Sequence, residues 1–198
     1  MFFYTSVTVF PDSEGYVELA KLVSSLNLNG YHGLRSLGYP LIISFLNENL
    51  FWVVLFQFSL GTTAIILWYK TLLNFKFNLK SSFLITLFFI QFYKRFFYET
   101  CILVESLVLF MITVLFYLIS IKILDKNGIF SLIGLSLFFA YLVLIKPFYA
   151  FLPFLFLFFL FVTKPKFRTI LSRNLILIIF PLFAYYDNYS ISIFKIKC

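Results

Sequence analysis

The chain has 198 residues, of which 62% are hydrophobic, 23% aromatic and only 12% charged. Soluble domains carry about 25% charged residues, so this chain has too few to cover a surface that faces water. Its 16 Lys and Arg and its 8 Asp and Glu give a net charge of +8. Because the basic residues are dispersed between long apolar stretches, they indicate cytoplasmic anchoring of membrane spans and not the basic patch of a nucleic-acid-binding protein.

The first 40 residues contain a short apolar segment and then the longest polar stretch of the chain. Residues 1–10, MFFYTSVTVF, lack the basic region of a signal peptide. They are also too few to cross a bilayer, which takes about 20 residues, so we interpret them as the end of a span. Residues 11–40 hold three of the eight acidic residues, the single His32 and four of the seven glycines.

A helix is predicted at the start of this polar stretch. The run Pro11-Asp12-Ser13 is typical of a helix start, with Asp12 or Ser13 as the N-cap and Glu14 in the first turn. An apolar stripe follows at the spacing i, i+3, i+4, i+7, and it consists of Leu19, Leu22, Val23 and Leu26. Because Glu18 and Lys21 lie opposite this stripe, the pattern predicts an amphipathic helix in the membrane interface. The turn-forming residues of 27–33 then predict a loop.

The rest of the chain alternates apolar stretches with short polar loops. A short apolar segment over 41–46 is followed by six expected apolar spans, over 50–69, 83–93, 101–121, 129–145, 148–162 and 175–186. The run Asn47-Glu48-Asn49 predicts an interruption after the first of these segments. The segment 83–93 is short and would need to extend past Lys94-Arg95 to cross a bilayer. The pair Lys146-Pro147 predicts a hinge between two helices. The sequence therefore predicts an all-α, polytopic transmembrane protein of about seven helices, including the truncated first one at residues 1–10. We expect it to form a single domain over residues 1–198.

The distribution of Lys and Arg between the loops predicts the orientation of the chain. If the 11–40 loop is outside, nine basic residues lie inside: Lys70, Lys76, Lys80, Lys122, Lys126, Lys164, Lys166, Arg168 and Arg173. Five lie outside, or seven if the last segment crosses: Lys21, Arg35, Lys94, Arg95 and Lys146, then Lys195 and Lys197. We therefore predict a multi-pass protein of the cell membrane whose first loop is extracytoplasmic.

Several short motifs occur in an order that resembles a known group of membrane enzymes. The matching positions are Pro11-Asp12-Ser13, Tyr16, Leu19-Ala20, Arg35, Gly38-Tyr39-Pro40, Glu105-Ser106-Leu107 and Lys146-Pro147. In this order they resemble the polytopic GT-C glycosyltransferases, in the branch related to protein O-mannosyltransferases and lipid A aminoarabinose transferases. The chain departs from that pattern at Leu37, where many relatives carry Pro, and at Lys146, where Arg is usual. Compared with such enzymes it is expected to be truncated at both ends.

The resemblance implies a glycosyltransferase that takes a sugar from a polyprenyl-phosphate donor at the outer face of the membrane. The acceptor would be a lipid, a glycan or a protein. No cofactor is implied, and the need for a divalent metal is left open. In this group of enzymes the acidic residue of the first loop is the favoured general base, and here that residue is Asp12.

Such a transfer needs a carboxylate that takes a proton from the acceptor hydroxyl, and cations that hold the leaving phosphate. We predict Asp12 as the catalytic base, with a plain N-cap as the alternative role, and Glu14 as the second catalytic candidate. The predicted substrate-binding residues are Arg35, Tyr39, Lys94, Arg95, Glu105 and Lys146.

Each charged residue among these binding candidates also has a simpler explanation. Arg35 offers a planar fork for a phosphate, but a snorkelling arginine at the interface gives the same pattern. Lys94-Arg95 and Lys146 either bind the phosphate or simply mark the ends of spans. Glu105 lies within an apolar stretch, where an ionisable group is costly and functional by default, or it reaches water near the start of that stretch.

Two other functions fit the same composition. A transporter or flippase for lipid-linked glycans would share the spans and the basic residues. It predicts functional polar residues at mid-membrane, whereas the candidates here lie toward one face. A non-catalytic remnant or assembly subunit is the other alternative, and the expected truncation favours it.

Overall fold

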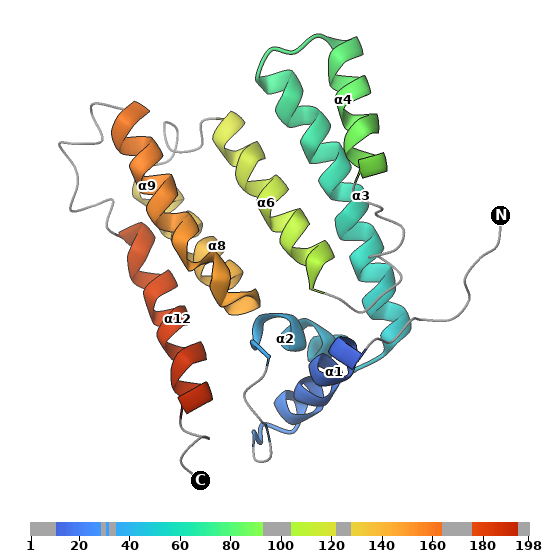
Figure 1. Cartoon of the computed structure of the whole chain (residues 1–198), viewed down its shortest axis with the longest axis vertical. Coiled ribbons are helices and arrows are strands. Elements are labelled where there is room, and N and C mark those ends of the chain that lie inside the picture. Colours follow the sequence, from blue (N-terminus) through green and yellow to red (C-terminus); the bar gives the residue numbers. More distant parts are fainter. Residues whose placement is uncertain are drawn as a thin grey trace. The chain divides into compact units, whose positions relative to one another are not determined.

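A computed structural model describes residues 11–28, 31, 35–92, 104–121, 128–163 and 176–193. Every regular element within these ranges is a helix (Figure 1), which confirms the all-α prediction for the described part of the chain. The chain divides into two compact units. Unit 1 comprises Met1–Asn29 with Tyr39–Ile123, and unit 2 comprises Gly30–Gly38 with Leu124–Cys198.

Unit 1 begins with α1 (Pro11–Ser24), the helix predicted from the polar stretch. The proline occupies the first helical position, where its fixed φ and missing N–H are tolerated best. Asp12 and Ser13 therefore lie in the first turn and not at the cap, a shift of one or two residues from the prediction. Glu18 and Lys21 are exposed, as the amphipathic pattern predicts.

The buried face of α1 differs from the predicted stripe. It consists of Ser13, Tyr16, Leu19 and Ala20, each at most 6% exposed. Leu26, the last member of the predicted stripe, lies beyond the helix and is 95% exposed, so its assignment to the apolar face was wrong. Leu26 instead ends the helix with a φ of 53°, because the N–H of Asn27 donates to the Leu22 carbonyl at 3.1 Å, the long bond of a Schellman cap.

The short helix α2 (Gly38–Phe45) and the long helix α3 (Leu50–Asn74) follow. The predicted interruption between them is confirmed, since Asn47 and Glu48 have positive φ values and Asn49 is the N-cap of α3. The side chain of Asn49 accepts a hydrogen bond from the N–H of Phe51 at 3.1 Å. The Ser24 hydroxyl donates to Glu48 Oε1 at 2.7 Å, which joins the end of α1 to this turn.

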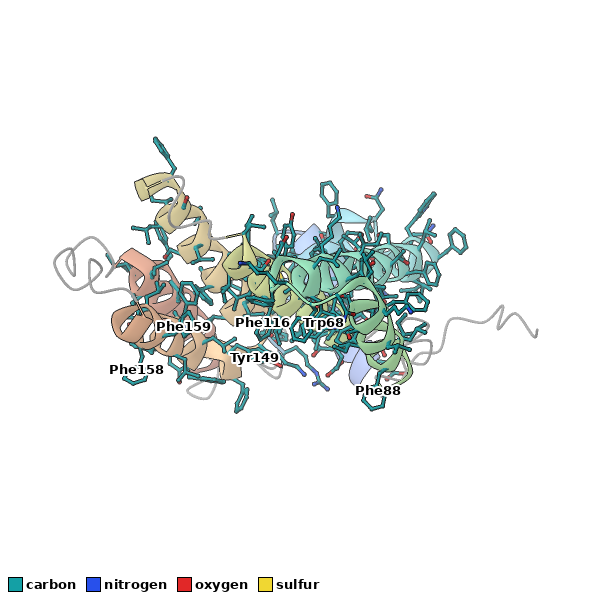
Figure 2. The ribbon with its side chains drawn as sticks, turned by 90° about the horizontal axis from the view of Figure 1, so that it is seen from above. Trp68, Phe88, Phe116, Tyr149, Phe158 and Phe159 are labelled. Carbon is teal, nitrogen blue, oxygen red and sulfur yellow. The ribbon has the colours of Figure 1, made fainter. Side chains whose placement is uncertain are left out.

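Helices α3, α4 (Leu79–Phe92) and α6 (Glu105–Ser120) form the body of unit 1 (Figure 1). The buried face of α3 recurs at helical spacing and consists of Val53, Gln57, Gly61, Ala64, Thr71 and Leu72. Between the helices, the Trp68 indole stacks on the Phe89 ring of α4 at 4.9 Å. It also meets the Phe116 ring of α6 edge to face at 6.0 Å (Figure 2).

Polar contacts fix the direction of these helices. Asn74 Nδ2 donates to Ser120 Oγ at 3.0 Å, so the C-terminal ends of α3 and α6 lie together and the two helices run parallel. Helices α1 and α2 lie at the opposite, N-terminal end of α3 and α6 (Figure 1). Helix α1 and Glu105, the first residue of α6, therefore share one end of unit 1.

Unit 2 contains α8 (Gly128–Ile145), the 3-10 helix η1 (Pro147–Phe151), α9 (Leu152–Thr163) and α12 (Ile176–Ile193). The predicted hinge is confirmed, because Lys146 is extended, with φ −144° and ψ 110°, as expected before a proline. Side chains from α8 and α12 meet in a small-residue cluster that includes Ala140, Val143 and Ala184. The last helix extends beyond the predicted 175–186 and contains Pro181.

One described helix, α3, is both long enough and apolar enough to span a membrane. Its 25 residues make it about 37 Å long, against a hydrocarbon core of about 30 Å. Only 22% of its most apolar window is buried, unlike the core helix of a soluble protein. The other apolar helices of the described ranges are shorter, so the polytopic arrangement stays a prediction.

Large aromatic side chains face outward on both units. Phe88 on α4 is 65% exposed and Phe158 on α9 is 66% exposed, and Figure 2 shows both rings pointing away from the helices. Other exposed phenylalanines are Phe51, Phe58, Phe83, Phe130, Phe154 and Phe183. Apolar surface on this scale is rare on soluble monomers, and it favours lipid contact.

Candidate functional site

A buried aromatic pair lies where α1 meets α2. Tyr39, the second residue of α2, is 1% exposed, and Tyr16 on α1 is 6% exposed. Their rings meet edge to face, with 5.2 Å between centroids, a geometry that aromatic pairs prefer. The spacing of Ser13, Tyr16 and Ala20 places Tyr16 on the buried face of α1, and this contact fixes the start of α2.

Glu105 lies close enough to Tyr39 to act on its hydroxyl electrostatically. It is the first residue of α6, where the positive end of the helix dipole favours a carboxylate. The residue as a whole is half-buried, and its Oε2 atom is shielded from solvent. Sequence analysis left open whether this carboxylate is enclosed or reaches water. In the structure the residue is partly exposed, but its Oε2 atom is enclosed.

Burial raises the pKa of the Tyr39 hydroxyl well above its ordinary value, and the nearby Tyr16 and Glu105 raise it further. Tyr39 is therefore a neutral phenol that can donate a hydrogen bond. Within the described part of the chain, its hydroxyl has no hydrogen-bond partner. A buried donor of this kind is costly to leave unsatisfied, so the arrangement suits a ligand that accepts a hydrogen bond.

The two predicted catalytic acids occupy different positions on α1. Asp12 lies in the first turn, four residues and so about one helical turn before Tyr16; its side chain is outside what the structure describes. Glu14 is exposed and does not share the buried face with Tyr16. Of the predicted residues in unit 1, the structure brings together Tyr39 and Glu105, with Asp12 one turn along the helix that carries Tyr16.

The predicted cations of unit 2 flank a second contact. The Ser36 hydroxyl donates to the carbonyl of Ile145, the last residue of α8. This bond brings the backbone of Arg35, which precedes Ser36, close in space to the backbone of Lys146, which follows Ile145. Both cations are half-buried. The backbone of Arg35 is fixed by the Tyr31 hydroxyl, which accepts from the Arg35 N–H and donates to its carbonyl.

Gly38 completes this contact. A Cβ atom built at this position would lie 2.6 Å from the Ile145 backbone nitrogen, a distance that no real side chain tolerates. The Tyr141 hydroxyl also donates to the Gly38 carbonyl at 3.2 Å. Gly38 is therefore required because the 35–38 segment approaches the end of α8 backbone to backbone.

Other predicted features lie outside the described residues or have no counterpart among them. Lys94 and Arg95 fall in the range 93–103, which the structure does not describe. The described residues contain no group of three or more His, Cys, Asp or Glu that could hold a metal ion. A divalent metal, which sequence analysis left open, therefore has no candidate site in the described ranges.

Sequence analysis missed the residues that hold the candidates in place. Tyr16 was matched to a motif but given no role, although its spacing from Ser13 and Ala20 was a usable signal. The sequence offered no signal for Ser36, because its partner Ile145 is 109 residues away in the chain.

Comparison of the chain with protein-family models, curated proteins and solved structures finds no match.

Proposed function

We propose that the chain is a multi-pass membrane glycosyltransferase that uses a polyprenyl-phosphate sugar as donor. The acceptor is a lipid, a glycan or a protein at the extracytoplasmic face. The main support is that motif residues far apart in the sequence are packed together. Tyr16 contacts Tyr39 close to Glu105, and the Arg35–Gly38 segment contacts α8 directly before Lys146.

The proposed reaction needs one base. As the acceptor hydroxyl oxygen bonds to the anomeric carbon, the bond from that carbon to the phosphate oxygen breaks, and polyprenyl phosphate leaves with the electron pair. The proton of the acceptor hydroxyl passes to a carboxylate. We assign this role to Asp12, which lies in the first turn of α1.

Tyr39 and Glu105 suit recognition of the sugar. The neutral phenol of Tyr39 donates a hydrogen bond, and the Glu105 carboxylate accepts hydrogen bonds from sugar hydroxyls. Because the two groups come from α2 and α6, the helices fix their separation before substrate arrives. Preorganised polar groups of this kind do not need to reorient during the reaction.

Arg35 and Lys146 suit the phosphate. The guanidinium of Arg35 offers a bidentate fork, and the Lys146 ammonium adds a point charge. Tyr31 fixes the Arg35 backbone and Ser36 holds it to the end of α8, which lowers the entropy that binding must overcome. Lys94 and Arg95 stay additional phosphate-binding candidates from the sequence.

The direct test is donor turnover. Membranes that contain the chain are incubated with polyprenyl-phosphate sugar labelled in the sugar, and both the labelled product and the released polyprenyl phosphate are measured. We expect turnover above chain-free membranes, with donor binding weakened about tenfold or more by Arg35→Ala, since charge-assisted bonds are the stronger ones. Lys21→Ala, at an exposed position on α1, is the matched control. The proposal is overturned if the chain gives no turnover and if Arg35→Ala and Lys21→Ala bind the donor with the same affinity.

A transporter of lipid-linked glycans is the second candidate, because polar residues are buried along the long helices. Gln57 on α3 is fully buried and Thr113 on α6 is 2% exposed. Buried polar groups within a span often mark a substrate path. Gln57→Leu separates the two functions, because a transporter would lose transbilayer movement of the lipid-linked glycan while the transferase would keep its turnover.

A further inference from the structure

Three exposed lysines lie in or beside the turn between α3 and α4. Lys70, Lys76 and Lys80 are all exposed, and the chain has no acidic residue between Glu48 and Glu99. Nothing within this stretch of sequence neutralises the three charges. The charged residues of this stretch of sequence are therefore all positive.

Apolar side chains share this exposed surface. Phe75 is 49% exposed, Phe77 47% and Leu79 68%. A surface that combines lysines with exposed rings suits the headgroup region of a membrane, where the rings enter the acyl boundary while the ammonium groups stay at the phosphates. We refer to these six residues as the α3–α4 tip.

The backbone of the α3–α4 tip is held by specific hydrogen bonds. Lys76 has a φ of 66°, and the Phe77 N–H donates to the Leu72 carbonyl at 3.2 Å, which closes α3 with a Schellman cap. Asn78 Oδ1 then accepts from the Ser81 N–H at 2.7 Å and caps α4. Because both caps are formed, the lysines and rings are displayed from a defined turn.

We infer that the α3–α4 tip binds the headgroups of anionic phospholipids. The three lysines supply the charge complementarity, and α3 is long enough to place the tip at the membrane surface away from α1 and α2. Each lysine near an anionic membrane surface strengthens binding by about fivefold at moderate salt. This inference needs α3 to cross the membrane, but it does not depend on the proposed sugar chemistry.

The test uses Trp68, which is eight residues before Lys76 on α3. In a Trp52→Phe background Trp68 is the sole tryptophan, and energy transfer from it to a dansyl-labelled phosphatidylglycerol reports binding by the full chain in mixed micelles. We expect phosphatidylglycerol to bind at least about tenfold more tightly than dansyl-labelled phosphatidylcholine, and high salt to reduce the difference.

Two triple variants then locate the site. Lys70→Gln/Lys76→Gln/Lys80→Gln should lower the phosphatidylglycerol affinity at least about tenfold. The control variant Lys21→Gln/Lys195→Gln/Lys197→Gln removes the same three positive charges from positions outside the α3–α4 tip. It should leave the affinity within about twofold, and it therefore separates the location of the charges from the net charge of the chain. Unchanged circular dichroism and Trp68 emission show that each variant is folded. Equal loss in the two triple variants, or equal affinity for the two lipids, overturns the inference, and competition by RNA but not by lipid points to a nucleic-acid partner instead.

Discussion

Tyr39 shows how a residue can be selected from the sequence without its role being visible there. The run Gly38-Tyr39-Pro40 was matched as a motif, which made Tyr39 a candidate for binding. Its burial at 1% exposure depends on Tyr16, which lies 23 positions earlier on another helix. Motif patterns identify residue types, but only packing shows that this phenol is enclosed and neutral.

The raised pKa of Tyr39 predicts a change in stability at high pH. In the folded chain the pKa lies above the ordinary value, which is about 10. The stabilisation is therefore fully present below about pH 10 and is lost as the pH rises above it, because the unfolded chain can ionise and the folded chain cannot. We expect the denaturation midpoint in detergent to fall more steeply above about pH 10 for wild type than for Tyr39→Phe.

The control for this prediction is Tyr186→Phe, whose ring is 67% exposed. This variant removes a tyrosine without removing a buried hydroxyl. It should follow the wild-type pH profile. If Tyr39→Phe and Tyr186→Phe give the same profile, the Tyr39 hydroxyl ionises equally in the folded and unfolded chains and the burial argument is wrong.

At the scale of the helices, local sequence predicted the breaks between elements better than their ends. Helix α3 continues to Asn74 instead of ending at residue 69, and α4 begins at Leu79 instead of residue 83. The breaks at Asn47–Asn49 and at Lys146-Pro147 follow from side-chain capping and from proline sterics, which act within a few residues. The end of α12 was predicted too early, at Tyr186, because a loss of apolar residues was taken as the end of the helix. The length of an apolar stretch indicates how much of a helix lies within a bilayer. It does not show where the helix itself ends, because a helix can continue into polar sequence.

The contact between Gly38 and α8 is the helix-scale feature that sequence could not predict. It joins positions more than 100 residues apart, so no local rule applies. Gly38→Ala would place a methyl group 2.6 Å from a backbone nitrogen. We expect it to destabilise the folded chain by about 1–3 kcal/mol, the cost of overpacking, as measured by thermal unfolding in detergent.

Gly134→Ala provides the matched control within α8. A Cβ atom there meets nothing within 4 Å, and alanine favours a helix over glycine by about 1 kcal/mol. The control should be neutral or slightly stabilising. Equal unfolding temperatures for the two variants would show that the Gly38 approach is not maintained in the protein.

For the whole molecule, composition predicted the all-α class, and the structure confirms it for the described residues. The number of crossings stays a prediction, because α3 alone among the described helices meets the length requirement. The orientation depends on the basic residues of the loops, nine against five or seven. Burial also changes how this orientation should be probed, since Ser13 in the first loop is inaccessible at 0% exposure.

Glu18 and Lys76 are better probes of orientation because both are exposed. In a Cys101→Ser/Cys198→Ser background, we expect Glu18→Cys to react with an impermeant thiol reagent in intact cells. Lys76→Cys should react only after the cells are permeabilised, because lysine-rich loops stay in the cytoplasm. The opposite labelling pattern would reverse the orientation, and labelling of both in intact cells would exclude a single crossing between them.

The most direct measurement of the central claim compares sugar transfer by Asp12→Asn and wild type. Asparagine matches aspartate in size and shape, but its amide cannot accept the proton of the acceptor. We expect turnover to fall by about a hundredfold to ten-thousandfold, or roughly 3–5 kcal/mol of barrier, with insertion and detergent stability unchanged. Glu18→Gln, at an exposed position on the same helix, should retain turnover. Wild-type turnover in Asp12→Asn would contradict the assignment, and Glu14→Gln would then test whether the second acid is the base.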